Sequence, residues 1–422
     1  MIDKKIALKK HLQNNGKIEI AGKIAIRNRE DLSIYYTPGV AYVSEEIKKN
    51  KLLAYEYTNK GNTIAIISDG TRILGLGDIG PEAGLPVMEG KALLFKKYGG
   101  VDAIPMCISA KNEEDIIKFI KAIEPSIAAV NIEDIESPKV FRIIKKASEI
   151  SKIPIFHDDQ YGTAVVTLGA MINAFKIAGK TKNSKIVIFG AGSAGYGITK
   201  LLHFAGYRNL YVFDSEGIIK KGRKKDMNEF KIELSKISNA KNIGYSINDA
   251  INGADLIIGT TGKKGYFKKE MIKKMNKNPI VFSLTNPEPE ISYDDAIKAG
   301  AYIVATGKSN FPNQVNNIIA FPGIIRGLLD VRAKKITMNM LYKAAIIIAE
   351  SVKDKLNREY IIPGASDEKK FFELSIDIAQ AVGMSAIKEK NARTVLTNSK
   401  IKEIASKRIK HYESMEKLLF DQ

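Results

Sequence analysis

The stretch IPIFHDDQYGT, residues 153–163, indicates the fold class of the chain. It begins as a short apolar, β-prone run and ends in two adjacent carboxylates, Asp158 and Asp159. A helix is expected to begin just after them, at Gly162. Open α/β sheets bind their ligands in the crevice at the carboxyl ends of parallel strands. The stretch therefore predicts a buried strand that delivers acids to a binding site.

A second strand-like run upstream ends in the same way. SIAAVNI, residues 126–132, is followed at once by Glu133 and Asp134. If the two strands are parallel neighbours, their acids converge at one edge of the sheet, and hard divalent cations such as Mg²⁺ or Mn²⁺ prefer such oxygen ligands. Helix caps and ion pairs are the alternative for a single acidic pair, but two strand-end pairs this close in the chain favour a cation site.

Length and composition are those of a cytoplasmic globular protein. A chain of 422 residues exceeds one ordinary core, so two domains with an appendage are expected. Its one cysteine, Cys107, cannot form an internal disulfide, which is typical of a reducing compartment. The first residues lack a signal-peptide pattern, and we expect no apolar run near the roughly 20 residues of a membrane helix. No membrane partner is expected.

The formal net charge of +19 raises the possibility of a nucleic-acid partner. Most basic residues, however, are scattered along helices. Only KKGRKK, residues 220–225, is a dense cluster, and no aromatic side chain is interleaved with it. Solvated faces that attract anionic substrates and nucleotides are the better interpretation, so no nucleic-acid partner is expected.

The first part of the chain alternates strands and helices, which predicts a parallel sheet. Strands are expected at 62–67, 101–108 and 126–132 before the one that ends at Asp158, with helices at 86–100, 112–123 and 139–150. Lys91 would lie in the first turn of the helix from Pro86, where a cation opposes the helix dipole and its pKa is lowered. An exposed lysine is the alternative.

A dinucleotide-binding unit is expected after residue 159. The strand KIVIF, residues 185–189, leads into GAGSAG, residues 190–195, then a helix, and then a strand that ends in Asp214. Glycines for the tight turn, a helix amino end for the phosphates and an acid for the ribose complete the fingerprint. Asp214 favours NAD because it repels a 2′-phosphate, while the basic residues near Arg223 keep NADP open. The similar GLGDIG, residues 75–80, is rejected because prolines follow it, and it is interpreted as a loop that carries Arg72 toward an anion.

Eight stretches together resemble the malic enzyme family, in the small-subunit form typical of prokaryotes. They are YYTPGVA, GLGDIGPEAGLPVMEGKALLFKKYGG, NIEDI, FHDDQYGTA, GAGSAG, SLTNPEPE, ATGKSNFPNQVNN and FPGIIRGLLDVRA. The resemblance implies an α/β fold of two domains: a parallel-sheet malate- and metal-binding domain (1–158), a Rossmann-type NAD(P)-binding domain (159–316), and C-terminal helices (317–422) that pack back on the first domain.

The resemblance also implies roles for individual residues. Tyr36, just before Thr-Pro-Gly, would be the general acid, although paired tyrosines at a turn are usually packing residues, and Lys91 would be the general base. Glu133, Asp134 and Asp159 would bind the metal, with Asp158 behind them. Malate carboxylates would contact Arg72, Asn286 and Asn317. The nucleotide would contact Gly190, Ala191, Gly192, Ser193, Ala194, Gly195, Asp214 and Asn286.

The implied activity is oxidative decarboxylation of L-malate to pyruvate and CO₂, with NAD or NADP (NAD favoured), Mg²⁺ or Mn²⁺, and a homodimer or higher oligomer. Lys91→Ala or Tyr36→Phe should lower the rate of turnover at least about 10²-fold with little change in folding. A malolactic enzyme that releases lactate is one alternative, and a catalytically silent NAD-binding regulator is another.

Overall fold

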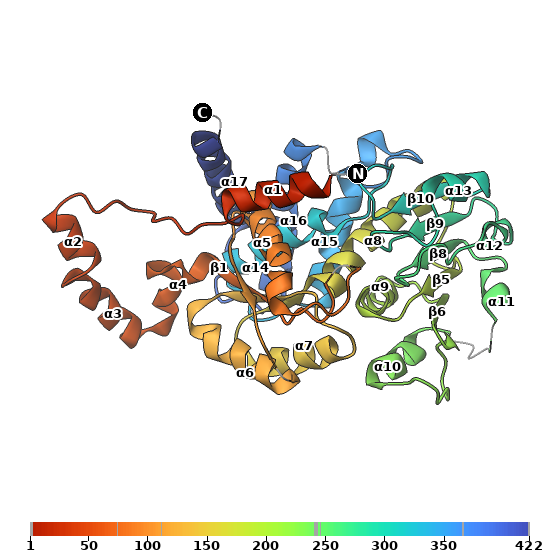
Figure 1. The fold of residues 1–422 in the computed structure, drawn as a ribbon, viewed down its shortest axis with the longest axis horizontal. Helices are drawn as coiled ribbons and strands as arrows, with labels where there is room; N and C mark the ends of the chain where they lie inside the picture. The colour runs from red at the N-terminus through yellow and green to blue at the C-terminus, as the bar shows by residue number, and fades with distance from the viewer. Residues whose placement is uncertain are drawn as a thin grey trace.

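The computed structural model describes residues 3–73, 75–110, 112–239, 244, 246–364 and 367–420 (Figure 1). Its first sheet has four parallel strands in the order β2-β1-β3-β4. They are β1 (Thr63–Ser68), β2 (Asp102–Cys107), β3 (Ala129–Ile132) and β4 (Ile155–His157). Every residue of β1 is buried, as expected for a central parallel strand covered on both faces. The predicted parallel sheet is confirmed.

The register of this sheet places three chain segments side by side at one edge. Ile67 of β1 pairs with Ile132 of β3, and Ile132 pairs with His157 of β4. The residues that follow these strands therefore leave the sheet together. They include Glu133 and Asp158, so the expected convergence of the two acidic pairs follows directly from the strand register.

The second sheet has six strands in the order β10-β9-β8-β5-β6-β7, and only β7 is antiparallel to its neighbour. The strands are β5 (Ile186–Phe189), β6 (Leu210–Asp214), β7 (Gly217–Ile218), β8 (Leu256–Gly259), β9 (Ile280–Ser283) and β10 (Ile303–Thr306). The accompanying helices are α9 (Ser193–Phe204), α10 (Glu229–Ile237), α11 (Ile247–Ile251), α12 (Lys269–Lys273) and α13 (Tyr293–Lys298). This is the predicted Rossmann-type unit.

Helices from both ends of the chain enclose the first sheet. They are α5 (Pro81–Gly99), α6 (Glu113–Ile123), α7 (Lys139–Ile150), α8 (Asp158–Ala178), α14 (Phe321–Asp330), α15 (Met338–Glu350), α16 (Glu368–Lys388) and α17 (Asn398–Phe420). α14, α16 and α17 pack against α5, and α15 packs against α8. Phe95 of α5 and Phe321 of α14 lie with ring centroids 4.6 Å apart. The last hundred residues thus form part of the same core as the first sheet.

α8 differs from its expected description in two ways. It begins at Asp158 instead of Gly162, so both acids lie in its first turn, where the helix dipole favours them. Its 21 residues also meet the length and composition criteria of a membrane span, contrary to the expectation for any run in this chain. Because 72% of its most apolar window is buried inside the protein, α8 is a core helix.

An N-terminal arm, defined as residues 24–53, projects from the body (Figure 1). The chain reaches it after α1 (Lys4–Asn14), and it contains α2 (Arg29–Tyr35) and α3 (Gly39–Lys49); α4 (Ala54–Tyr57) follows where the chain rejoins the body. No residue of the arm is buried. Its exposed large hydrophobic side chains are Ile24, Ile26, Leu32, Ile34, Tyr35, Tyr36, Val40, Tyr42, Val43 and Leu52.

Candidate active site

Lys91 lies at the centre of a buried polar cluster at the carboxyl edge of the first sheet. Its Nζ donates to Glu133 Oε1 at 2.7 Å and to Asp158 Oδ2. Nζ also lies 4.6 Å from the centroid of the Phe321 ring, in a cation–π contact. The side chain is 11% exposed, so the alternative of a solvated surface lysine is excluded.

The helix that carries Lys91 begins earlier than the sequence indicates. α5 starts at Pro81, directly after Gly80 at φ +80°, and Pro86 lies inside the helix. Lys91 is therefore in mid-helix, so the dipole argument for a lowered pKa is wrong. Burial does work to lower the pKa of Lys91, but the adjacent Asp158 and Glu133 carboxylates outweigh it, and the pKa lies above its ordinary value. In this arrangement Lys91 is an ammonium group.

The four predicted acids come together as the register requires. Glu133 is 5% exposed, and Asn131 Nδ2 donates to its Oε2 at 2.7 Å. Asp134 adopts φ +50°, and its backbone hydrogen-bonds the carboxylate of Asp159. Burial, together with the neighbouring Asp159 and Asp158 charges, raises the pKa of Glu133 to about 7. Burial and the charges of Asp159 and Glu133 likewise raise the pKa of Asp134 to about 8.

Asp158, which is predicted to lie behind the metal ligands, contacts both Lys91 and Asn317 directly. Its side chain is fully buried, and its Oδ2 accepts from Lys91 and, at 2.5 Å, from Asn317 Nδ2. Its Oδ1 is buried without a hydrogen-bond partner in the described part of the chain. A Cβ on residue 162 would lie 1.9 Å from that oxygen, which explains why Gly162 stands there.

The carboxylates of this cluster form a candidate site for a divalent cation. Three carboxylates from two strand ends, Glu133, Asp134 and Asp159, suit Mg²⁺ or Mn²⁺ in their chemistry. Within the described residues, however, no three His, Cys, Asp or Glu side chains are arranged to hold a metal ion together. Lys91 accounts for part of this, because it holds Glu133 by an ion pair. The donors fit a hard cation, and their side chains must turn to share one.

The predicted malate contacts are placed unequally. Asn317, the first residue of the short helix η4 (Asn317–Ile319), joins the cluster through Asp158. Arg72 is exposed on the loop after β1, and its backbone N–H donates to Asp134 O at 3.1 Å. Asn286 lies beyond β9, where its Nδ2 donates to Gly307 O at 3.4 Å. The structure thus links Asn317 and Arg72 to the acids and leaves Asn286 with the nucleotide-binding unit.

The remaining predicted catalytic residue, Tyr36, lies on the arm. It follows α2 in the arm and its side chain is 66% exposed. Figure 1 shows α2 projecting outward, whereas Lys91 is on α5 within the body. Within one chain, the proposed acid and the proposed base are therefore on separate parts of the molecule.

The glycine-rich loop has the geometry that its sequence predicts. It leads from β5 into α9, and Gly190 has φ +109°. A Cβ on residue 195 would lie 1.8 Å from Gly190 O, and a Cβ on residue 190 would lie 2.4 Å from Thr260 O. α9 begins at Ser193, and its N-cap residue, Gly192, has no side chain to cap the helix, so the backbone N–H groups at its amino end suit the binding of a phosphate.

Sequence reasoning missed three residues that shape the cluster. Asn131 lies in β3 two residues before Glu133, which follows the strand, and the strand period of two could have revealed it. Phe321 and Gly162 position Lys91 and Asp158 through packing. Phe321 reaches the cluster from 230 positions along the chain, so no local pattern in the sequence indicates it.

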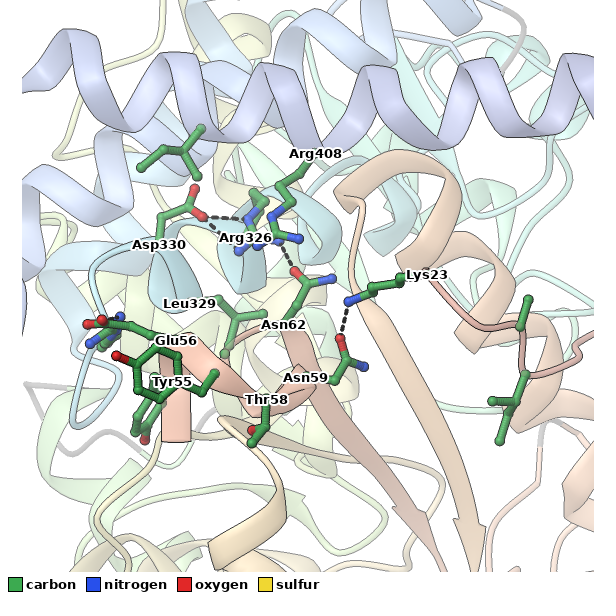
Figure 2. Close-up of a pocket in the computed structure, with 16 residues that line it drawn as sticks. Lys23, Tyr55, Glu56, Thr58, Asn59, Asn62, Arg326, Leu329, Asp330 and Arg408 are labelled. Carbon is green, nitrogen blue, oxygen red and sulfur yellow. Dashed lines mark hydrogen bonds and ion pairs between the residues drawn. The ribbon is translucent and has the colours of Figure 1, made fainter. Parts of the chain in front are cut away.

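A cavity of about 640 Å³ lies elsewhere, where the arm joins the body (Figure 2). Asn62, Arg326, Asp330 and Arg408 are among its lining residues. Arg326 Nη1 donates to Asn62 Oδ1 at 2.6 Å, and Arg326 Nε donates to Asp330 Oδ1 at 2.8 Å. No predicted site residue lines this cavity, so it is separate from the Lys91 cluster.

Two family models match the chain and leave little of it uncovered. "Malic enzyme, N-terminal domain" matches residues 15–148, and "Malic enzyme, NAD binding domain" matches residues 160–387. The chain belongs to the malic enzyme family. The resemblance inferred from the eight stretches is confirmed, and so is the fold class.

Individual family members agree with this assignment. The chain is 45% identical over 399 residues to the bifunctional malic/malolactic enzyme of Bacillus subtilis, covering 94% of this chain and 96% of that protein. It is 47% identical over 356 residues to the NAD-dependent malic enzyme of Geobacillus stearothermophilus, covering 84% and 74%. The crystal structure of Entamoeba histolytica malic enzyme superposes with a TM-score of 0.93 at 40% identity, covering 99% and 88%. Other family members are named NADP-dependent malic enzymes.

Proposed function

We propose that this chain catalyses the oxidative decarboxylation of L-malate to pyruvate and CO₂ with an NAD(P) cofactor. The observation that carries the proposal is the buried cluster of Lys91, Asp158, Glu133 and Asn317, which combines a proton-transfer group with a set of carboxylates. α8 connects this cluster to the nucleotide unit, because its first turn bears Asp158 and its body packs against α9.

The cofactors would supply what the side chains lack. A divalent cation held by Glu133, Asp134 and Asp159 would supply Lewis-acid chemistry at the malate C2 oxygen and neighbouring carboxylate. The dinucleotide would supply the oxidising equivalent from a position against Gly190, Gly192 and the amino end of α9.

Lys91 would move the proton of the C2 hydroxyl group. Since an ammonium group has no lone pair, Lys91 must first lose its own proton. Asp158 and Glu133 are its hydrogen-bond acceptors and form the route along which that proton leaves. Neutral Lys91 then accepts the hydroxyl proton as C2 is oxidised, and such positioned transfer contributes about 10²–10⁴-fold in rate.

The malate carboxylates would be held by neutral and cationic donors at the rim of the cluster. Arg72 is exposed on the loop whose backbone bonds Asp134, and its guanidinium group would bind a carboxylate through two parallel hydrogen bonds. Asn317 already donates to Asp158 and would place its amide beside the C1 carboxylate, while Asn286 would close the site from the nucleotide unit.

We further propose that the working enzyme is a homodimer in which Tyr36 serves the Lys91 cluster of the partner subunit. The arm that carries Tyr36 has no buried residue and exposes ten large hydrophobic side chains, an arrangement that marks an interaction surface. In a two-fold symmetric dimer each arm covers the other copy, so both sites receive their missing tyrosine. The Tyr36 hydroxyl would donate the proton to C3 after CO₂ has left.

Mixing two inactive variants tests the shared site. Tyr36→Phe removes the acid, and Asp159→Asn removes a predicted metal ligand whose side chain is 36% exposed, so both should fold. After subunit exchange, half of the dimers are mixed and one site in each is intact, so about a quarter of wild-type activity should return. If Tyr36 acts within its own chain, every site carries a defect and no activity returns.

The activity itself is tested by malate turnover with each nucleotide in the presence of Mn²⁺. Formation of pyruvate with a matching amount of reduced nucleotide supports the proposal. Lactate without net nucleotide reduction would support the malolactic alternative, which the name of the Bacillus subtilis relative keeps open. Nucleotide binding without any malate turnover would support the alternative that the protein is a catalytically silent NAD-binding regulator.

We also propose that the enzyme works in the cytoplasm. Its one cysteine, Cys107, is partly buried at the end of β2 and has no disulfide partner, as is usual in a reducing compartment. Fractionation of the native host, followed by immunoblotting, would locate it.

A further inference from the structure

The carboxylate of Asp214 is fully engaged by protein donors. Arg223 grips it with two parallel bonds, Nη1 to Oδ1 at 2.7 Å and Nη2 to Oδ2 at 2.5 Å. Lys231 Nζ lies 2.9 Å from Oδ2, and the backbone N–H of Glu216 donates to Oδ1 at 2.9 Å. A carboxylate offers about four acceptor positions, so all of them are occupied.

The occupied acceptor positions conflict with the expected role of Asp214 in selecting NAD. An acid that selects NAD must accept hydrogen bonds from the ribose hydroxyl groups and must repel a 2′-phosphate. Asp214 has no free acceptor for a hydroxyl group, and its side chain is only 7% exposed. Its charge faces the positive charges of Arg223 and Lys231. Glu216 and Asp226 add two negative charges, which pair with Lys225 and Lys231. The 220–225 loop and Lys231 together carry six positive charges, so the local charge does not disfavour a phosphate.

The loop that Arg223 ties to the end of β6 is basic. It is the KKGRKK segment, residues 220–225, and the Arg223–Asp214 fork anchors it beside the expected ribose position. Lys221 and Lys224 are exposed, and neither makes an ion pair with any residue in the described part of the chain. Ser215, directly after Asp214, is also exposed.

We propose that this site selects the 2′-phosphorylated nucleotide, NADP, and that the 2′-phosphate binds between Ser215 and the lysines of the 220–225 loop. Asp214 is then a positioning residue that holds the loop through Arg223 and makes no contact with the ribose. The inference rests on the proposed function for its choice of nucleotide, and it reverses the preference for NAD inferred from the charge of Asp214 alone.

Calorimetric titration with nucleotide fragments tests the selection without malate or turnover. The probes are 2′,5′-ADP and 5′-AMP, which differ only in the 2′-phosphate. One charge-assisted hydrogen bond to that phosphate corresponds to at least about tenfold tighter binding of 2′,5′-ADP. Equal affinity, or tighter binding of 5′-AMP, would overturn the proposal.

Substitutions in the loop locate the phosphate. Lys221→Ala combined with Lys224→Ala should bring the two affinities within about twofold by weakening 2′,5′-ADP alone. Lys273→Ala, an exposed lysine on α12 outside the loop, is the matched control and should leave the ratio unchanged. An unchanged ratio in the double variant would refute the assigned location.

Asp214→Asn separates positioning from direct contact. If Asp214 only anchors the loop, the variant loses affinity for 2′,5′-ADP and keeps its affinity for 5′-AMP. If Asp214 binds the ribose, affinity for 5′-AMP falls as well, and the positioning role is wrong. Malate turnover with NAD instead of NADP would reject this inference and leave the proposed reaction standing.

Discussion

Replacing Lys91 with alanine should destabilise the protein as well as inactivate it. The Glu133 and Asp158 side chains that Lys91 pairs with are 6% and 0% exposed. Without the ammonium group, two carboxylates remain in a nearly water-free position with no cation in contact. Breaking a buried ion pair by removing one partner costs about 3–5 kcal/mol. This replaces the sequence-based expectation that Lys91→Ala leaves folding unchanged.

The assay is urea unfolding followed by far-ultraviolet circular dichroism, without nucleotide or metal. Lys118→Ala is the matched control, because the side chains of its ion pair with Glu114 are 71% and 72% exposed, and solvent screens such a pair so that its loss should leave the stability almost unchanged. Adding Asp158→Asn to Lys91→Ala removes one of the stranded charges, so the double variant should regain part of the lost stability.

Two results would refute this reasoning. One is an unfolding free energy of Lys91→Ala within about 1 kcal/mol of the wild type, the size expected for an exposed pair. The other is additive destabilisation in the double variant, which would mean that Lys91 and Asp158 do not interact in solution.

The remaining predictions concern other parts of the molecule. Tyr36→Phe should lose at least about 10²-fold in turnover with an unchanged urea midpoint, because the Tyr36 side chain is 66% exposed. Asp159→Ala should abolish turnover, and EDTA should do so reversibly in the wild type; activity that persists in chelator would exclude the cation. Gly195→Ala should raise the nucleotide KM about a hundredfold, since its Cβ would lie 1.8 Å from Gly190 O. Burial, with the nearby charges of Asp134 and Glu82, raises the pKa of the Cys107 thiol to about 11. Iodoacetamide should therefore modify Cys107 more slowly than free cysteine at pH 8, with a rate that still rises toward pH 11; a plateau near pH 9 would contradict this.

The sequence predicted the sheets and the convergence of the acids because both follow from local patterns. Short apolar runs predict two strands that end in Glu133-Asp134 and Asp158-Asp159. The parallel register of these strands then brings the carboxylates together. The surroundings of Lys91 were not predictable in this way. The helix is expected to begin at Pro86, whereas Gly80 and Pro81 set its start five residues earlier.

Tertiary contacts that no local sequence pattern specifies account for the other differences. Asn317 and Phe321 reach Asp158 and Lys91 from the far side of the nucleotide unit. The fork between Arg223 and Asp214 spans only nine residues, yet the fingerprint of glycines and one acid does not specify it. Sequence patterns thus identified which residues meet at the site, and tertiary contacts decided what each carboxylate is free to bind.

The return of α14 to α5 determines the order in which the parts of the chain can fold during synthesis. The six strands of the second sheet lie between Ile186 and Thr306, so this sheet is available early, whereas the first sheet must wait for Phe321 and Arg326 to cover it and α8 must wait for α15. A nascent chain arrested before residue 317 should therefore be protease-sensitive in its amino-terminal half and in α8, and better protected in the second sheet. Translation must pass the whole nucleotide-binding segment before the proton-transfer machinery can exist.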